Sequence, residues 1–361
     1  MVNKHNYIIV GQGLAGSLLA YSLRQAGKSV LIVDSFKPNS SSRVAAGLIN
    51  PVTGRRMVKT WQSDTLLPFA EKTYLELEGY FKKPFFFKMN IARLFTHAEQ
   101  KNDWEIKQTS AEYKNYVCSG PDPLNYKHIR APLGFSEIRG SARVDVKMLL
   151  FLFTNDFIEK EQLLSEKFDY QDIKVTPEMI FWKKFSASKL IFCEGTGISN
   201  NPYFNRLPLS GTKGELLTVK IPALKSGRII KHGIFIIPLG NQLFRVGATY
   251  NHEDKCESVT LQAREELIRK LKLILKTPFS IIDQQAGFRP VVIDRRPVIG
   301  LHPLFPSLGI FNGLGTKGVS LTPYFAANFT NNLIHGTPIH PEADINRFSF
   351  ENKSPTPSEN P

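Results

Sequence analysis

The sequence contains few cysteines and no long apolar run. Its three cysteines, Cys118, Cys193 and Cys256, lie far apart without a CxxC pair, which argues against a zinc ribbon, a redox dithiol and a secreted disulfide framework. No uninterrupted apolar stretch reaches the about 18 residues of a transmembrane helix. The first apolar run begins a few residues after Met1, which leaves no room for a cleavable signal. We therefore expect a protein of the cytoplasm, a reducing compartment.

The composition excludes disordered and collagen-like chains, because hydrophobic residues make up 42% and charged residues 22% of the 361. Lys and Arg total 46 against 32 Asp and Glu, a formal net charge of +14. Nucleic acid, acidic lipid surfaces and anionic substrates could all be attracted by such a bias. Basic residues are spread from Lys4 to Lys353, which favours ordinary solvated surface charge over a dedicated basic tract.

The chain begins with a βαβ pattern. An apolar run, Tyr7 to Val10, is typical of a strand buried on both faces of a parallel sheet. A stripe at helical spacing follows and ends at Gly27, and a second apolar run ends at Asp34. We expect these elements to form one unit.

The rest of the chain predicts two interleaved domains of an α/β protein, more closely an α+β two-domain fold. Helices are expected over 61–81 and 261–276, the second with Leu261, Leu267, Ile268, Leu271 and Leu275 on its buried stripe. Strands of a mostly antiparallel sheet are expected at 85–89, 92–96, 214–220, 233–238 and 243–249. The nucleotide-binding domain would comprise 1–60, 141–204 and 279–336, and the substrate domain 61–140 and 205–278. A tail over 337–361, rich in Pro, Ser and Asn, is expected to be extended on the surface or disordered.

Glycines at 11, 13 and 16 form a G-x-G-x-x-G motif between the first strand and helix. Such glycines permit a tight turn, close approach of a pyrophosphate and close packing of helix on strand. The helix tip that includes Leu14 and Ala15 offers N–H groups and a positive dipole end to phosphates. Asp34 is placed to accept both ribose hydroxyls. The pattern predicts dinucleotide binding, and the carboxylate disfavours a 2′-phosphate.

A second glycine-rich loop, Gly313 to Gly318, precedes the last predicted helix. Too little chain follows it for a second complete βαβ unit. The alternative is a second helix tip aimed at another polar part of the same cofactor. A reduced isoalloxazine carries charge at N1 and the C2 carbonyl, which the helix dipole and Lys317 could stabilise.

At these residues the sequence resembles the FAD-dependent oxidoreductases of the D-amino-acid oxidase type, which include glycine oxidase, sarcosine oxidase and the flavin domain of a tRNA-uridine modification enzyme. The resemblance lies in ordered blocks at 11–34, 41–49, 244–249, 287–300 and 313–318. It implies a Rossmann-like FAD-binding domain interleaved with an antiparallel-sheet substrate domain. The cofactor contacts expected from these patterns are Gly11, Gly13, Leu14, Ala15, Gly16, Asp34, Ser41, Ser42, Arg43, Ala46, Gly47, Gly195, Gly313, Gly315, Thr316, Lys317 and Gly318.

The same resemblance assigns Arg289, in Gly287-Phe288-Arg289-Pro290, to the substrate carboxylate. A guanidinium suits this role because its planar fork makes two parallel charge-assisted bonds. A structural arginine beside a rigid proline is the alternative. Tyr250 is a second catalytic candidate, although a tyrosine at a sheet edge is commonly packing, and His232 favours a structural role.

The stretch 50–61 departs from small-amine oxidases. Its cations Arg55, Arg56 and Lys59 could line an entrance for an anionic substrate or simply be solvated. No His follows Asp34 in the FAD loop and no Cys follows Cys256, so we expect FAD to be bound without a covalent link. No metal site is expected.

The leading interpretation is oxidation of a primary or secondary amine of an amino-acid-like substrate to an imine, with oxygen or another electron acceptor. A tRNA-modifying flavoprotein is an alternative that the charge favours, although the sequence has no recognisable RNA module. A second alternative is an FAD-binding reductase that uses NAD(P)H, although no second complete dinucleotide site is present. The amine, its stereochemistry and the oligomeric state are not defined by these patterns.

Overall fold

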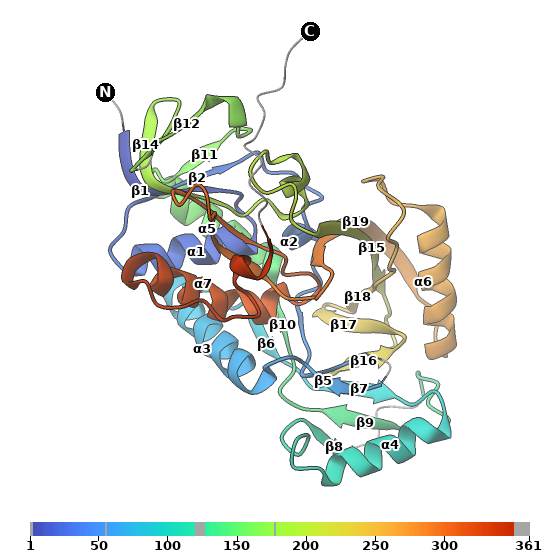
Figure 1. Ribbon diagram of the computed structural model, residues 1–361. Helices are drawn as coiled ribbons and strands as arrows, with labels where there is room; N and C mark the ends of the chain where they lie inside the picture. Colours follow the sequence, from blue (N-terminus) through green and yellow to red (C-terminus); the bar gives the residue numbers. More distant parts are fainter. Residues whose placement is uncertain (1–2, 55, 120–126, 177, 350–361) are drawn as a thin grey trace. The chain divides into compact units, whose positions relative to one another are not determined.

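The computed structural model describes residues 3–54, 56–119, 127–176 and 178–349. The chain divides into two units, each built from separate segments (Figure 1). Unit 1 comprises residues 1–43, 147–212 and 288–361, and unit 2 comprises residues 44–146 and 213–287. Residues 44–60, placed in the nucleotide-binding domain from the sequence, fall in unit 2, where β3 pairs with β10. The mixed α/β architecture confirms the expected fold class.

The sheet of unit 1 is parallel at its centre. Strand β1 lies between β2 and β14 and is parallel to both, with Val10 opposite Val33 and Phe192. On its other side, β14 has two neighbours. Its first residues pair with the antiparallel strand β13, and its last residues pair with the parallel strand β21. Strand β20 pairs with β21 in the antiparallel direction. The strands are β1 (Asn3–Val10), β2 (Val30–Asp34), β11 (Leu163–Ser165), β12 (Ile173–Val175), β13 (Ile180–Trp182), β14 (Phe185–Phe192), β20 (Val298–Leu301) and β21 (Leu308–Asn312).

Helices α1 (Leu14–Gln25) and α7 (Gly318–His335) pack side by side in unit 1 (Figure 1). The leucines of α1 and its single glycine, Gly16, are buried. The other helices of this unit are α2 (Ser41–Val44) and α5 (Val146–Glu159), each with an end in unit 2. The polar run 37–43 that follows β2 thus ends in a short helix.

The tail is not extended or disordered as far as residue 349. Ile345 is fully buried in the core of unit 1, and Gly300 of β20 packs against it. A short 3₁₀ helix spans Ile345–Arg347. The prediction was wrong here because isolated apolar residues in a Pro-rich, polar stretch produce no periodic pattern, although each fills a gap in the core.

Unit 2 contains a large, mainly antiparallel sheet in the order β19-β15-β18-β17-β16-β7-β9-β8, in which only β16 and β7 are shown to pair in parallel. Helix α6 (Leu261–Ile274) covers one face through Leu267, Leu271 and Ile274 (Figure 1). The strands are β7 (Ile91–Leu94), β8 (Val117–Ser119), β9 (Phe135–Ile138), β15 (Leu209–Lys220), β16 (Ile229–His232), β17 (Ile234–Gly240), β18 (Leu243–Gly247) and β19 (Ser280–Val292).

The remaining elements of unit 2 are short strands and two helices. Strands β3 (Leu48–Ile49), β10 (Ala142–Val144) and β6 (Phe86–Lys88) form a separate sheet, so the predicted strand at 85–89 does not join the large one. Strands β4 (Val52–Thr53) and β5 (Val58–Lys59) form a hairpin, and the helices are α3 (Ser63–Phe81) and α4 (Ala98–Thr109).

The helix predicted over 261–276 is present, but Leu261 does not belong to its buried stripe. Its side chain is 70% exposed, whereas Ala263 is buried. Leu261 is the first helical residue after the N-cap Thr260 and lies off the face that meets the sheet. Among the described residues, no helix is both long and apolar enough to cross a lipid bilayer.

Candidate functional site

The glycine turn between β1 and α1 is required by the packing of the backbone. A Cβ at Gly11 would lie 2.4 Å from the carbonyl oxygen of Cys193, and one at Gly16 would lie 1.9 Å from that of Gly11. No side chain fits at either position. Gly13 differs, because a Cβ there would meet only the Ser42 hydroxyl, at 3.2 Å. A side chain at Gly13 would therefore press on the hydroxyl that accepts from the N–H of Leu14, rather than on the backbone.

Asp34, at the end of β2, holds this turn. One carboxylate oxygen accepts from the backbone N–H of Gln12 and the other from that of Phe36. A carboxylate has about four acceptor positions, so two remain for further donors. Gln12, buried between the glycines, also binds Ser17 and accepts from Arg43. The acid is thereby fixed beside the α1 tip.

The segment after Asp34 returns to the same tip. The Ser42 hydroxyl accepts from the backbone N–H of Leu14 at 3.0 Å, which satisfies one of the otherwise free donors at the start of α1. The guanidinium of Arg43 lies over the Phe36 ring, 5.1 Å from its centroid. Ser41 donates to the carbonyl of Phe288 at 2.6 Å. This contact brings the residue before Arg289 to the glycine turn.

The second glycine loop begins at the end of β21. Asn312, almost fully buried, accepts from the N–H of Gly313 and donates to the carbonyl of Gly195 at 2.8 Å. Gly313 and Gly315 have φ of 74° and 54°, the left-handed region that favours glycine. The loop leads into α7, whose first turn has no side-chain cap.

Lys317 precedes α7, and Thr316 beside it is exposed. Burial lowers the pKa of Lys317, and the nearby cations Arg296 and Arg295 lower it further. An anion close to Lys317 would offset both effects. The α7 tip therefore presents a cation and unsatisfied N–H groups together.

The two helix tips lie close together within unit 1. A Cβ at Gly318 would be 3.8 Å from the Leu14 side chain, and one at Gly195 would be 4.0 Å from the Ser41 hydroxyl. The predicted residues of unit 1 thus gather at one edge of the parallel sheet. We call this group the helix-tip cradle: Gly11, Gly13, Leu14, Ala15, Gly16, Asp34, Ser41, Ser42, Arg43, Gly195, Gly313, Gly315, Thr316, Lys317 and Gly318.

The residues before and after Arg289 are both hydrogen-bonded to the helix-tip cradle through their backbone carbonyls. The carbonyl of the preceding Phe288 accepts from Ser41, and the carbonyl of the following Pro290 accepts from the N–H of Gly315 at 2.9 Å. The side chain of Arg289 is partly exposed. Its backbone position is therefore fixed from both sides by loops of the cradle.

Three other predicted residues fall in unit 2. Gly47, with φ of 70°, cannot carry a side chain because a Cβ would lie 1.8 Å from the carbonyl oxygen of Val144. Ala46 precedes it and is partly exposed. Tyr250 follows β18, is 54% exposed and packs edge-on against His252. Their roles toward a cofactor or substrate stay predictions.

The predicted cationic entrance is the β4–β5 hairpin. Arg55 lies outside the described residues. Arg56 is exposed, and its carbonyl accepts from the Lys107 ammonium at 3.3 Å. Lys59 pairs with Asp64. Among the described residues, no cluster of His, Cys, Asp and Glu is suited to hold a metal ion.

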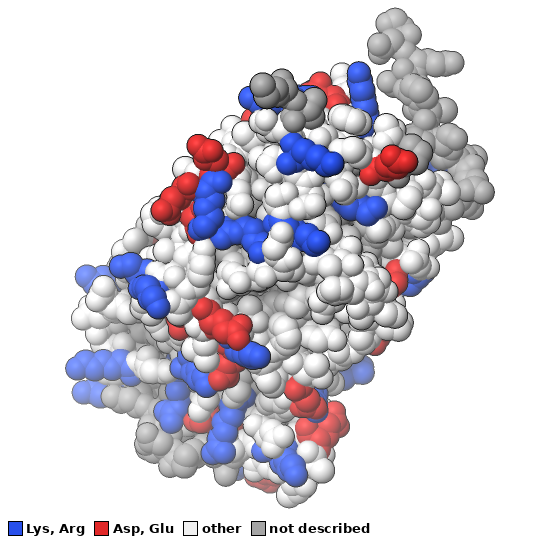
Figure 2. Space-filling model, turned by 90° about the vertical axis from the view of Figure 1, so that its left-hand side faces the viewer, with Lys and Arg blue, Asp and Glu red and all other residues white. Residues whose placement is uncertain are grey.

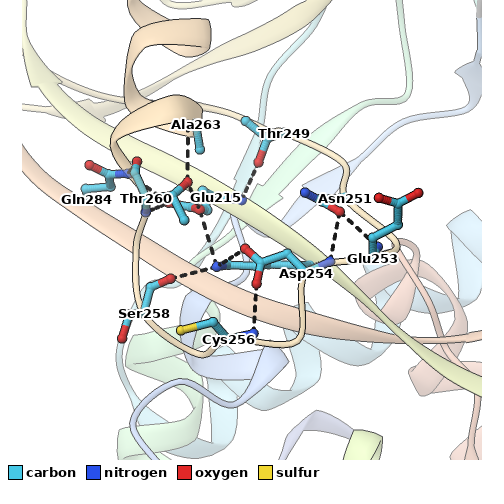
Figure 3. Close-up of polar contacts among 11 residues, drawn as sticks. Glu215, Thr249, Asn251, Glu253, Asp254, Cys256, Ser258, Thr260, Ala263 and Gln284 are labelled. Carbon is cyan, nitrogen blue, oxygen red and sulfur yellow. Dashed lines mark hydrogen bonds and ion pairs between the residues drawn. The ribbon is translucent and has the colours of Figure 1, made fainter.

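A buried ionic network fixes the segment after Tyr250 (Figure 3). Lys213 is 1% exposed, and its ammonium donates to Asp254 and to the carbonyl of Ser258, both at 2.7 Å. Glu215, 3.6 Å from the same ammonium, accepts from the hydroxyl and N–H of Thr260. Thr260 caps α6. The network ties the loop that begins at Tyr250 to both β15 and α6.

A sequence profile of FAD-dependent oxidoreductases matches residues 6–331. The chain belongs to this family. The glycine oxidase of Bacillus licheniformis is 25% identical over 379 residues, which cover 98% of this chain and 99% of that protein. The crystal structure of iminodiacetate oxidase from Chelativorans sp. BNC1 superposes with a TM-score of 0.77 at 19% identity, covering 92% of this chain and 96% of that one. A bifunctional tRNA 5-methylaminomethyl-2-thiouridine biosynthesis protein of Azoarcus sp. is 26% identical over 182 residues, which cover 44% of this chain and 28% of that protein.

The helix-tip cradle fits the FAD of this family. Gly13 carries no side chain at the N-cap of α1, which would let a pyrophosphate approach the N–H groups of that helix. Two acceptor positions on Asp34 suit a ribose, and the α7 tip with Lys317 suits a second anionic or polar group. We assign these residues to FAD as a proposal.

Sequence reasoning missed two residues of the cradle, Gln12 and Asn312. Both are nearly fully buried amides that cross-link its loops. A polar residue in the middle of the G-x-G turn, and an asparagine immediately before the second glycine loop, were the available signals. Amides are common in turns, so neither signal distinguishes a cross-link from ordinary turn chemistry.

Proposed function

We propose that this FAD-dependent oxidoreductase oxidises the C–N bond of a small amino-acid-like amine to an imine, which water then hydrolyses. The position of Arg289 carries the proposal. Its two neighbouring carbonyls are bonded to the two loops assigned to FAD, so a carboxylate bound to this guanidinium would be held beside the cofactor. Relatives named glycine oxidase and iminodiacetate oxidase act on such amines.

Bound FAD supplies a two-electron acceptor for a hydride from the carbon next to the nitrogen. The contribution of the chain is binding and orientation. Arg289 would bind the carboxylate through two parallel charge-assisted bonds, which fixes the direction of the adjacent C–H bond. The amine gives its proton to solvent before the reaction, so no dedicated general base is needed. Tyr250 is proposed as a further substrate contact, and oxygen or another acceptor takes the electrons from the enzyme.

The test is anaerobic mixing of the holoenzyme with a panel of amino acids and N-alkyl glycines, followed at the oxidised flavin band. For a substrate that bleaches this band, Arg289→Met should raise KM by about 10- to 150-fold, which corresponds to loss of a hydrogen-bonded charge worth about 1.5–3 kcal/mol. Arg289→Lys should recover part of the affinity, because it keeps the charge without the planar fork.

Arg295→Met is the matched control, since Arg295 is exposed in the same segment. It should leave KM unchanged. If no amine on the panel bleaches the flavin, or if Arg289→Met affects amines with and without a carboxylate equally, the proposal is wrong.

A tRNA-linked substrate is the second candidate. The net charge of +14 and the similarity to a tRNA biosynthesis protein favour it. On the face shown in Figure 2, however, Lys and Arg are interspersed with Asp and Glu. A titration of tRNA binding with salt separates the two candidates. For a tRNA enzyme, the logarithm of the binding constant should fall steeply and linearly with the logarithm of the salt concentration. An enzyme for free amino acids should show no tRNA binding.

A further inference from the structure

Glu194 is an acid beside the glycine turn that the assignment of residues to FAD does not use. It follows Cys193 at the carboxyl end of β14, the strand next to β1. A Cβ at Gly11 would lie 2.4 Å from the carbonyl oxygen of Cys193 and 3.5 Å from the backbone nitrogen of Glu194. Asp34 ends β2, on the other side of β1. The turn therefore has an acid on each side.

The carboxyl group of Glu194 is held by two neutral donors. The hydroxyl of Tyr170 donates to one oxygen at 2.5 Å, and the amide of Asn201 donates to the other at 2.8 Å. Asn201 is fully buried, and its own oxygen accepts from the backbone N–H of Tyr203. All of these residues belong to unit 1. Within the described part of the chain, no cation pairs with Glu194.

Glu194 also fixes a turn that is bonded to the second glycine loop. Glu194 and Asn201 flank the two ends of the 3₁₀ helix Gly195–Asn200, so the bond between their side chains closes this turn. The carbonyl of Gly195, the first residue of the turn, accepts from the amide of Asn312. A change at the carboxyl group of Glu194 can therefore act on the helix-tip cradle through the backbone.

The surroundings of Glu194 favour its neutral form. Burial raises the pKa of this carboxyl group, and the hydrogen bonds from Tyr170 and Asn201 offset only part of the effect. The titratable side chains around it are Tyr170, Tyr203 and Cys193. Burial raises the pKa of all three, so they are neutral near about pH 7. None of them supplies a charge that would stabilise an ionised Glu194.

The pyrophosphate of FAD would bring negative charge to the same turn. Salt screens partly buried charges little, so an ionised Glu194 and the phosphates would repel each other. We propose that Glu194 is a positioning residue for FAD that acts as the neutral acid, and that FAD binding is coupled to uptake of a proton by this group. The proton comes from solvent and binds a carboxyl oxygen of Glu194. This inference rests on the assignment of the helix-tip cradle to FAD and not on the amine substrate.

The first experiment counts the protons. Calorimetric titration of the apoprotein with FAD, in two buffers of different ionisation enthalpy, gives the proton uptake from about pH 5 to pH 8. Wild type should take up more protons than Glu194→Gln, whose amide cannot ionise. Uptake by Lys317, which an anion also favours, is common to both proteins and cancels in this comparison.

The same titrations give the affinity for FAD. The dissociation constant of wild type should rise about 10-fold over this range, which corresponds to a pKa difference of about one unit between apoprotein and holoenzyme. Glu194→Gln should lose most of this rise and bind at every pH about as tightly as wild type does at the lowest pH. Glu159→Gln, which changes an exposed acid of unit 1, is the control and should behave as wild type.

A second variant separates charge from structure. Tyr170→Phe removes a hydrogen bond that lowers the pKa of Glu194, so the rise in the dissociation constant should move to higher pH. The affinity at low pH should stay within about 2-fold of wild type. A purely structural role would instead weaken FAD binding by the same factor at every pH. If Glu194→Gln does not fold, Tyr170→Phe decides the question alone.

Equal proton uptake by wild type and Glu194→Gln, or a loss of affinity that does not depend on pH in the variants, would overturn the proposal. Gly13→Ala tests the assignment on which it rests. Normal FAD affinity in Gly13→Ala would count against the cradle itself, whereas equal proton uptake together with weakened binding in Gly13→Ala would count against Glu194 alone. Failure of every amine to reduce the flavin would count against the proposed function and would leave the proton coupling unaffected.

Discussion

Replacing Gly13 and Gly16 separately by alanine distinguishes a glycine required by the cofactor from one required by the fold. Gly13 has φ of −79° and ψ of −171°, a conformation open to any residue, and a Cβ there meets only the Ser42 hydroxyl at 3.2 Å. As an N-cap, alanine is less favourable than glycine by less than about 1 kcal/mol. Gly13→Ala should therefore fold nearly as well as wild type without FAD.

The same methyl group should obstruct FAD, because it occupies the space through which a pyrophosphate reaches the N–H groups of α1. Loss of one or two hydrogen bonds to a charged group costs about 1.5–3 kcal/mol, so the dissociation constant of FAD should rise about 10- to 150-fold. Titration of the apoprotein with FAD, followed by flavin fluorescence, measures this change.

Gly16→Ala should show the opposite pattern. Its Cβ would lie 1.9 Å from the backbone oxygen of Gly11, and overpacking of this kind costs about 1–3 kcal/mol, more than the about 1 kcal/mol that alanine gains in a helix. The apoprotein should therefore be less stable in urea. Gly79→Ala, within α3 and with no atom within 4 Å of its Cβ, is the control and should leave both stability and FAD affinity nearly unchanged. The reasoning fails if Gly13→Ala binds FAD normally, or if it destabilises the apoprotein as much as Gly16→Ala does.

Two further predictions concern unit 2. Lys213→Met should lower the free energy of unfolding in urea by about 3–5 kcal/mol, because Glu215 stays buried without its cation. The control Lys270→Met breaks only the partly exposed i,i+4 pair with Glu266 and should lower it by under about 0.5 kcal/mol. Equal losses for the two variants would contradict the assigned network. The pKa of His232 lies below its model-peptide value of about 6.5, chiefly because the side chain is buried. The neutral imidazole therefore contributes to stability in full above about pH 6.5, and this contribution is lost as the pH falls through the lower pKa of the folded state. An NMR titration of His232 should show the lowered pKa, and a normal pKa in wild type would refute this prediction.

The parts of the fold that the sequence predicted best are those with local causes. The βαβ unit follows from two apolar runs around a glycine-rich turn, and β1, α1 and β2 lie within it as expected. Gly11 and Gly16 are glycines for the predicted reasons of tight turn and close packing. Asp34 lies at the predicted strand end, but its two backbone bonds to Gln12 and Phe36 could not be foreseen, because they depend on how the turn closes.

The parts that were missed depend on contacts between distant segments. Ile345 completes the core of unit 1 from a stretch without periodicity, and Asn312 contacts Gly195 across more than one hundred residues of sequence. The backbone bonds that fix Arg289 likewise come from Ser41 and Gly315. A motif identifies residue types at a spacing, whereas these contacts exist only after the sheet has assembled.

Comparison of Lys213 with Arg93 shows that the surroundings of a buried cation cannot be read from a sequence. Both are single cations within strands of the same sheet, and both are nearly fully buried. Lys213 faces α6 with Asp254, Glu215 and a carbonyl around its ammonium, so its charge is compensated by the protein. Arg93 faces the other side, next to Ser136 and Lys231 on the adjacent strands, and no carboxylate of the described residues forms an ion pair with it. Burial alone therefore does not indicate a function.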